Sequence, residues 1–128
     1  MTDLVGREAS PSERVEGMTL ICAVERIDRE SGVAALVDGE VVAVFRTYDD
    51  QVFALSNYDP FGRAGVLARG IVGTRHVDGE DVPFVASPLH KQAFDLRTGQ
   101  CLDDPAVRVP SYEVVVSDGL VLVGGRNL

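Results

Sequence analysis

The side chains best suited to chemistry are few in this chain and lie far apart along it. The cysteines are Cys22 and Cys101, and the histidines are His76 and His90. A zinc site or a redox pair needs closely spaced ligands, as in Cys-x-x-Cys, and no such spacing occurs. We therefore expect each cysteine to be a small buried hydrophobic residue, and His76 to lie at the surface. No metal site is predicted.

Two carboxylate motifs could act as acids or bases, but each also fits a turn. Asp59 precedes Pro60, and Asp103-Asp104 precedes Pro105. Paired or isolated carboxylates can transfer protons, whereas Asx-Pro sequences initiate turns, which we favour at both places. The chain has no Gly-x-Gly-x-x-Gly, P-loop, Gly-x-Ser-x-Gly or His-Glu-x-x-His motif. We expect no catalytic residues, and the chain alone is not expected to be an enzyme.

The elements that position these residues are short apolar runs separated by glycine and aspartate. The runs are too short for helices and rich in β-branched residues, which indicates strands. They read TLICAV, VAALV, VVAVF, QVFALS, VPFVAS, YEVVV and LVLVG. Short strands with almost no helix predict an all-β antiparallel sandwich or small barrel.

Turn residues predict two hairpins. Asp38-Gly39 and Asp118-Gly119 each separate two of the apolar runs, and Asp-Gly pairs tolerate the positive φ angles of tight hairpin turns. Between residues 60 and 81 the sequence shows neither alternation nor a helical stripe. We predict an irregular excursion there, with a helical turn around residues 64–68.

Composition limits the class of protein. A chain of 128 residues is long enough for one domain with its own core. Residues 1–17 are polar and predict a flexible leader, which leaves residues 18–128 as a single domain. The net charge of −8 disfavours nucleic acid and anionic membranes as partners. With no signal peptide and no long apolar segment, we expect a cytoplasmic location.

Residues 87–99, SPLHKQAFDLRTG, carry a resemblance. They resemble the second cluster-binding loop of Rieske iron-sulfur domains, which runs Cys-Pro-x-His, then Phe-Asp, then Thr-Gly in a turn. The hairpin before the first loop and the closing Tyr-x-Val-x-Val-x-Asp-Gly hairpin match the same pattern. The resemblance covers about residues 18–124 and implies a Rieske-like β-sandwich or small barrel.

A Rieske cluster needs two thiolates and two imidazoles, and the resemblance implies where they would stand. The first loop would supply positions 57 and 59, and the second would supply positions 87 and 90. Those positions hold Asn57, Asp59, Ser87 and His90. Three of the four ligands are absent, and hard oxygen donors do not replace soft sulfur. We therefore predict a degenerate site with no cluster.

One branch of the superfamily is most similar to this chain, namely the small subunits of assimilatory NAD(P)H-dependent nitrite reductases. These are similar in five segments that occur here in the same order: residues 57–61, 66–70, 86–89, 91–94 and 101–104. The resemblance implies a large partner subunit that carries FAD, an iron-sulfur cluster and siroheme. That complex would reduce nitrite to ammonium with NADH or NADPH.

Two functions follow from the resemblance. The preferred one is a non-catalytic accessory subunit whose former cluster loops contact the large subunit. The alternative is an electron-transfer protein of the Rieske ferredoxin type, with an unusual cluster held by Cys101, His90 and Asp59 and with Cys22 as a further candidate ligand. The candidate contact residues are Asn57, Asp59, Pro60, Phe61, Pro88, Leu89, His90, Lys91 and Gln92.

Overall fold

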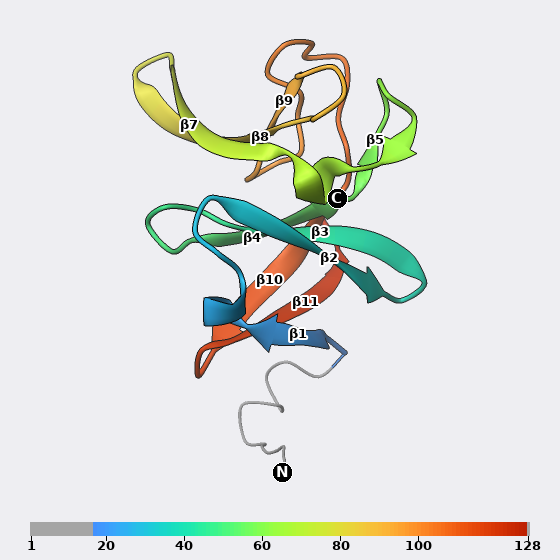
Figure 1. Ribbon diagram of the computed structural model, residues 1–128, viewed down its shortest axis with the longest axis vertical. Coiled ribbons are helices and arrows are strands. Elements are labelled where there is room, and N and C mark those ends of the chain that lie inside the picture. Colours follow the sequence, from blue (N-terminus) through green and yellow to red (C-terminus); the bar gives the residue numbers. More distant parts are fainter. Residues whose placement is uncertain (1–16, 128) are drawn as a thin grey trace.

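The computed structural model of the protein describes residues 17–127, almost all of them in or between short antiparallel strands (Figure 1). Residues 1–16, nearly the whole predicted leader, lie outside the described part. Among residues 17–127, no helix is long and apolar enough to cross a membrane. The elements are β1 (Thr19–Ala23), η2 (Val24–Arg26), β2 (Ser31–Val37), β3 (Glu40–Arg46), β4 (Val52–Ser56), β5 (Tyr58–Asp59), β6 (Ala64–Gly65), η3 (Leu67–Arg69), β7 (Ile71–Val77), β8 (Glu80–Ala86), β9 (Ala93–Asp95), β10 (Ser111–Ser117) and β11 (Leu120–Arg126).

The strands form one large and two small sheets. The large sheet has six strands in the order β1-β11-β10-β4-β3-β2, and the smaller ones are β7-β8-β9 and β5-β6. Figure 1 shows the three-stranded sheet and β5 together at one end of the molecule, with the six-stranded sheet below them. The predicted all-β antiparallel architecture is confirmed.

Strand β3 divides the hydrophobic core into two clusters because it is buried on both faces. Successive side chains of a strand point to opposite faces. Val42 and Val44 join a cluster built from strands of the large sheet. Ala43 and Phe45 join a second cluster, which also contains Phe94 of the three-stranded sheet. This second cluster fixes the small sheet, and hence the loop between β8 and β9, on the large one.

Both hairpins predicted from Asp-Gly turns are confirmed, and the structure contains a third Asp-Gly hairpin that the sequence analysis missed. Residues Asp38, Gly39, Asp118 and Gly119 all have positive φ angles at the turns between β2 and β3 and between β10 and β11. The missed turn is Asp78-Gly79, which joins β7 to β8 with the same signature.

The predicted irregular excursion over residues 60–81 is therefore wrong in its second half, where β7 occupies residues 71–77. Cross-strand pairing with β8 forms this strand although its own pattern is weak. The predicted helical turn around residues 64–68 is displaced. The structure has a short bridge at 64–65 and the 3₁₀ helix η3 at 67–69.

The conformation of the Asp78-Gly79 turn predicts how replacing Gly79 changes stability. Its φ angle is +85°, and a Cβ atom added there meets nothing within 4 Å. Gly79→Ala should therefore cost about 1 kcal/mol of unfolding free energy through backbone strain alone. Gly125→Ala is the matched control, because it has equally open space without a left-handed φ, and it should cost nothing. Urea denaturation measures both, and equal losses would show that the turn conformation is not the cause.

Candidate functional site

The two loops that correspond to the former cluster loops lie against each other at one end of the molecule. The first follows β4 and begins at Asn57, and the second connects β8 to β9 over residues 87–92. The hydroxyl of Ser87 donates a hydrogen bond of 2.5 Å to Oδ2 of Asp59, and both side chains are buried. One hydrogen bond thus joins two loops that are 28 residues apart. We call residues 57–63 and 87–92 together the loop tip.

Asp59 organises the first loop around its buried carboxylate. Its Oδ1 accepts a hydrogen bond of 2.9 Å from the backbone N–H of Phe61, and its carbonyl accepts one of 2.7 Å from Arg63. A carboxylate bonded to the N–H two residues on is an Asx turn, so the turn predicted at Asp59-Pro60 is confirmed. The Asp59 side chain is 0% exposed. It therefore stabilises the loop from the interior and does not contact solvent.

Ser87 organises the second loop in the same way. Its Oγ accepts a hydrogen bond of 3.2 Å from the N–H of Leu89 while it donates to Asp59. Its backbone carbonyl accepts from the N–H of Lys91 at 3.0 Å, and its N–H donates to the carbonyl of Gln92 at 2.9 Å. Ser87 thus makes hydrogen bonds within its own loop as well as the one to the first loop.

Asn57 attaches the first loop to the large sheet. Its N–H donates to the carbonyl of Val41 at 3.1 Å, its carbonyl accepts from Leu67 at 3.0 Å, and its Oδ1 accepts from the N–H of Ala68 at 2.8 Å. Asn57 is buried. The Asn57 side chain therefore holds the 3₁₀ helix η3 against the start of the first loop.

The predicted contact residues divide by exposure. Asn57 and Asp59 are buried, so they can affect a partner only through the neighbours that they position. Pro60, Phe61 and Gln92 are half-buried. Exposed at the surface are Pro88, Leu89, His90 and Lys91.

Sequence reasoning missed two exposed residues of the loop tip, Tyr58 and Arg63. Half of Tyr58 is exposed, between the buried Asn57 and Asp59. Tyr58 could have been found from the sequence, because alternate residues of an extended segment face opposite sides, and Tyr58 therefore faces away from Asn57 and Asp59.

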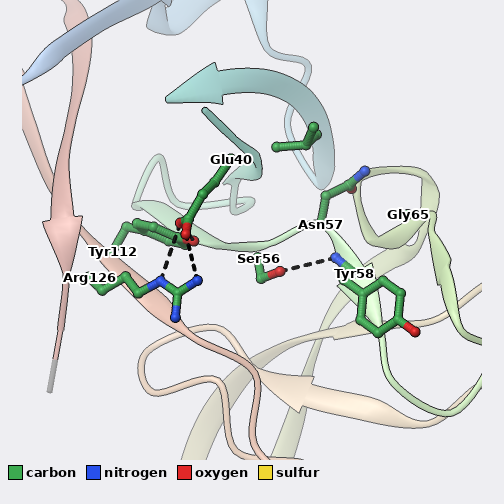
Figure 2. A pocket seen from close by; sticks show the side chains of 8 residues that line it. Glu40, Ser56, Asn57, Tyr58, Gly65, Tyr112 and Arg126 are labelled. Carbon is green, nitrogen blue, oxygen red and sulfur yellow. Dashed lines mark hydrogen bonds and ion pairs between the residues drawn. The ribbon is translucent and has the colours of Figure 1, made fainter. Parts of the chain in front are cut away.

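A hollow lies beside the first loop, between the loop and the strand ends of the large sheet (Figure 2). On one side, Oη of Tyr112 donates to Oε1 of Glu40 at 2.6 Å, and Nη2 of Arg126 donates to Oε2 at 2.6 Å. Its volume is about 520 Å³, and the residues that line it are Glu40, Val41, Ser56, Asn57, Tyr58, Gly65, Tyr112 and Arg126. The hollow holds a closed polar network rather than a nucleophile beside a base.

The network in the hollow shifts the pKa values of Glu40 and Tyr112. Hydrogen bonds from Arg126 and then Tyr112 lower the pKa of Glu40, because they favour its charged form. Burial raises the pKa of Tyr112, and its hydrogen bond to the Glu40 carboxylate raises it further. Both shifts keep Glu40 ionised and Tyr112 protonated, which are the states that the hydrogen bonds require.

The lowered pKa of Glu40 predicts a pH-dependent contribution to stability. A carboxyl whose folded pKa is below its unfolded value stabilises the fold above the ordinary value of 4.5, and loses that contribution as the pH falls through the folded pKa. Glu40→Gln should therefore lower stability near neutral pH and make no difference in strong acid. Urea unfolding at several pH values measures this. Glu113→Gln, on an exposed strand position, is the control, and a Glu40 effect that persisted in strong acid would contradict the assignment.

Comparison with known proteins places this geometry in a family. A model of the Rieske-like [2Fe-2S] domain matches residues 18–124. The chain belongs to the Rieske-like [2Fe-2S] domain family. That range contains both loops of the loop tip and all of the strands except the last two residues of β11, so the predicted resemblance is confirmed.

Within the Rieske-like family, the chain is homologous to nitrite reductase small subunits. It is 47% identical to the nitrite reductase (NADH) small subunit of Escherichia coli K12 over 106 residues, which are 82% of this chain and 94% of that protein. It is also 37% identical over 123 residues to the nitrite reductase [NAD(P)H] large subunit of Klebsiella oxytoca. That match covers 96% of this chain and 12% of the large subunit.

Solved Rieske-like structures agree. The crystal structure of a proposed NADH-dependent nitrite reductase small subunit from Mycobacterium tuberculosis superposes with a TM-score of 0.77 at 43% identity, covering 87% of this chain and 95% of that one. The ferredoxin of carbazole 1,9a-dioxygenase from Nocardioides aromaticivorans superposes with a TM-score of 0.72 at 29% identity, covering 85% and 98%. Fold is thus shared with ferredoxins, while sequence is closer to the nitrite reductase subunits.

The residues of this Rieske-like domain do not fit a [2Fe-2S] cluster. Asn57, Asp59 and Ser87 stand at three ligand positions, and their oxygen atoms are engaged in hydrogen bonds within the loop tip. Their hard oxygen donors also lack the softness that cluster iron requires. Of the four positions, only His90 keeps a ligand type, and it lies at the surface. Across residues 17–127, no three His, Cys, Asp or Glu side chains are grouped to hold a metal.

The cysteines do not complete such a site either. Cys101 is buried in the core cluster that includes Phe94, whereas Cys22 lies on β1 against the other cluster. Burial raises the pKa of both thiols, which disfavours the thiolate that binds iron. The ligand set of the alternative hypothesis, Cys101 and Cys22 with His90 and Asp59, is therefore not brought together.

Proposed function

We propose that the chain is the non-catalytic small subunit of a cytoplasmic nitrite reductase that takes electrons from NADH or NADPH and reduces nitrite to ammonium. One observation carries the proposal: the identity of 47% extends over 94% of the Escherichia coli small subunit. FAD, an iron-sulfur cluster and siroheme belong, in this proposal, to a large partner subunit. The small subunit then contributes by contact rather than by electron transfer of its own.

The match to the Klebsiella oxytoca large subunit supports the partnership. A segment similar to nearly all of this chain occurs within a polypeptide about eight times as long, since the match is 12% of that protein. A domain that is fused to a large subunit in one protein and separate in another is expected to occupy the same place in both. The loop tip is our candidate for the contact, because the exposed apolar residues Tyr58 and Leu89 lie there.

Reconstitution with the large subunit tests the proposal. Nitrite-dependent oxidation of NADH or NADPH and ammonium release should rise when the chain is added to the separately purified large subunit. Replacing Pro88, Leu89 and His90 with serine should remove both the rise and co-purification. The control replaces Val116 and Leu120, exposed residues on the β10-β11 hairpin, and should leave both intact. Co-purification that survives the triple change would refute the loop tip as the contact.

The absence of cluster ligands predicts a colourless protein. Purified without oxygen from iron-replete cells, the isolated chain should contain no stoichiometric iron and show no visible absorption bands, because oxygen donors at three ligand positions do not hold an iron-sulfur cluster. An ultraviolet-visible spectrum with iron analysis measures this. Stoichiometric iron with visible bands would instead favour the electron-carrier hypothesis and make His90 and Cys101 the first residues to replace.

A further inference from the structure

The charge of the loop tip is opposite to that of the chain. The full sequence has 20 acidic and 12 basic residues, and its net charge is −8. Three charged residues lie in the loop tip: Arg63 and Lys91 are exposed, whereas Asp59 is fully buried. The charges that the loop tip presents to a partner are therefore cationic.

Ion pairing separates these two cations from most arginines of the fold. Elsewhere in residues 17–127, five arginines pair with carboxylates. Arg97 pairs with Glu80 and Arg126 with Glu40, both within 3.0 Å. Within the same range, neither Arg63 nor Lys91 has a carboxylate at ion-pair distance. Their charges are therefore available to carboxylates of another molecule.

The loop tip also holds its apolar residues in fixed positions. Leu89 is 48% exposed, yet its side chain packs closely on Gly62: a Cβ atom added at Gly62 would lie 2.5 Å from Leu89 Cδ1 and 3.3 Å from Leu89 Cβ. Lys91 has a φ angle of +65° and is held by the hydrogen bond from its N–H to Ser87. Because the loops are already ordered, a partner loses little free energy in ordering them.

We propose that the loop tip binds an acidic patch on the large nitrite reductase subunit, with Leu89 in an apolar depression and Arg63 and Lys91 paired with carboxylates around it. This inference rests on the proposed function. An apolar centre with a charged rim is the usual anatomy of a specific interface. The acidic remainder of the domain is repelled by the same patch, so the charge distribution orients the small subunit with its loop tip toward the partner.

Charge also argues against two other occupants of the loop tip. Nucleic acid is repelled by the net charge of −8, and two copies of the chain repel each other by the same charge. An acidic patch that is confined to one place on the large subunit differs from both, because in the oriented complex it faces only the cationic loop tip.

Lys91 allows a direct test, because it is the only lysine in the chain. A zero-length carbodiimide reagent joins an amine to a carboxylate in contact with it. Applied to the assembled complex, it should link Lys91 to an aspartate or glutamate of the large subunit, identified by peptide mass spectrometry. Lys91→Arg keeps the charge and should abolish the link without loss of binding. Links from Lys91 to a second copy of the chain, or none in an intact complex, would overturn the inference.

Affinity measurements separate this inference from the proposed function. The Kd for the large subunit should rise with salt, and the double variant Arg63→Glu, Lys91→Glu should bind about 10- to 100-fold more weakly at low salt. Arg26→Glu, an exposed cation on η2 outside the loop tip, is the matched control and should bind almost normally. If wild-type binding does not weaken with salt, or if the double variant binds as tightly as the wild type, the acidic patch alone is refuted. No binding by the wild type at any salt concentration refutes both.

Discussion

Replacing Asp59 with alanine should lower the free energy of unfolding by about 3 kcal/mol, as measured by urea denaturation. The carboxylate is fully buried and accepts hydrogen bonds from Ser87 Oγ and the N–H of Phe61. Its removal leaves the buried Ser87 hydroxyl and the partly buried N–H of Phe61 without their acceptor, and an unsatisfied buried donor costs about 1–3 kcal/mol. The loss should be accompanied by weaker binding of the large subunit, because the bond between the two loops disappears.

A double-mutant cycle isolates the bond between the loops. Ser87→Ala removes the donor and should cost about 1–2 kcal/mol. The variant with both changes should lose clearly less than the sum of the two single losses, because the shared hydrogen bond is counted once. Asp59→Asn keeps the volume and one acceptor, and should be milder than alanine. Strictly additive losses would show that Asp59 and Ser87 stabilise their loops independently.

Phe94→Ala should have the largest effect of the single substitutions, about 3–5 kcal/mol. The ring is fully buried in the cluster that joins the two larger sheets, and its centroid lies 6.2 Å from that of Phe61 in the first loop. A cavity at Phe94 therefore loosens both the core and the support of the loop tip. Denaturation measures the stability, and hydrogen exchange of the amides of residues 57–63 measures the effect on the loop.

Phe94→Leu is the control for this cavity. It keeps most of the buried volume and should cost about 1 kcal/mol, with near-normal exchange in the first loop. If alanine lowered stability without faster exchange in residues 57–63, the contact between Phe94 and Phe61 would not be what holds the loop.

Local sequence was sufficient for most of the fold. Alternation of apolar residues and Asp-Gly turns predicted the strands and two hairpins, because side-chain direction and turn conformation depend on neighbouring residues. The same logic could have found the hairpin at Asp78-Gly79. It was missed because β7 has glycine, arginine and histidine among its residues, and pairing with β8 rather than its own pattern makes it a strand.

The loop tip shows the boundary between sequence and tertiary structure. The sequence alone determined that three cluster ligands are absent and that the chain resembles nitrite reductase small subunits, since both depend on residue type and order. Only the tertiary structure showed that Asp59 is buried against Ser87, and that Arg63 and Lys91 are the exposed charges beside them. The physical reason is distance along the chain: Asp59 and Ser87 are 28 residues apart, and only the packing of the small sheets on the large one brings their loops together.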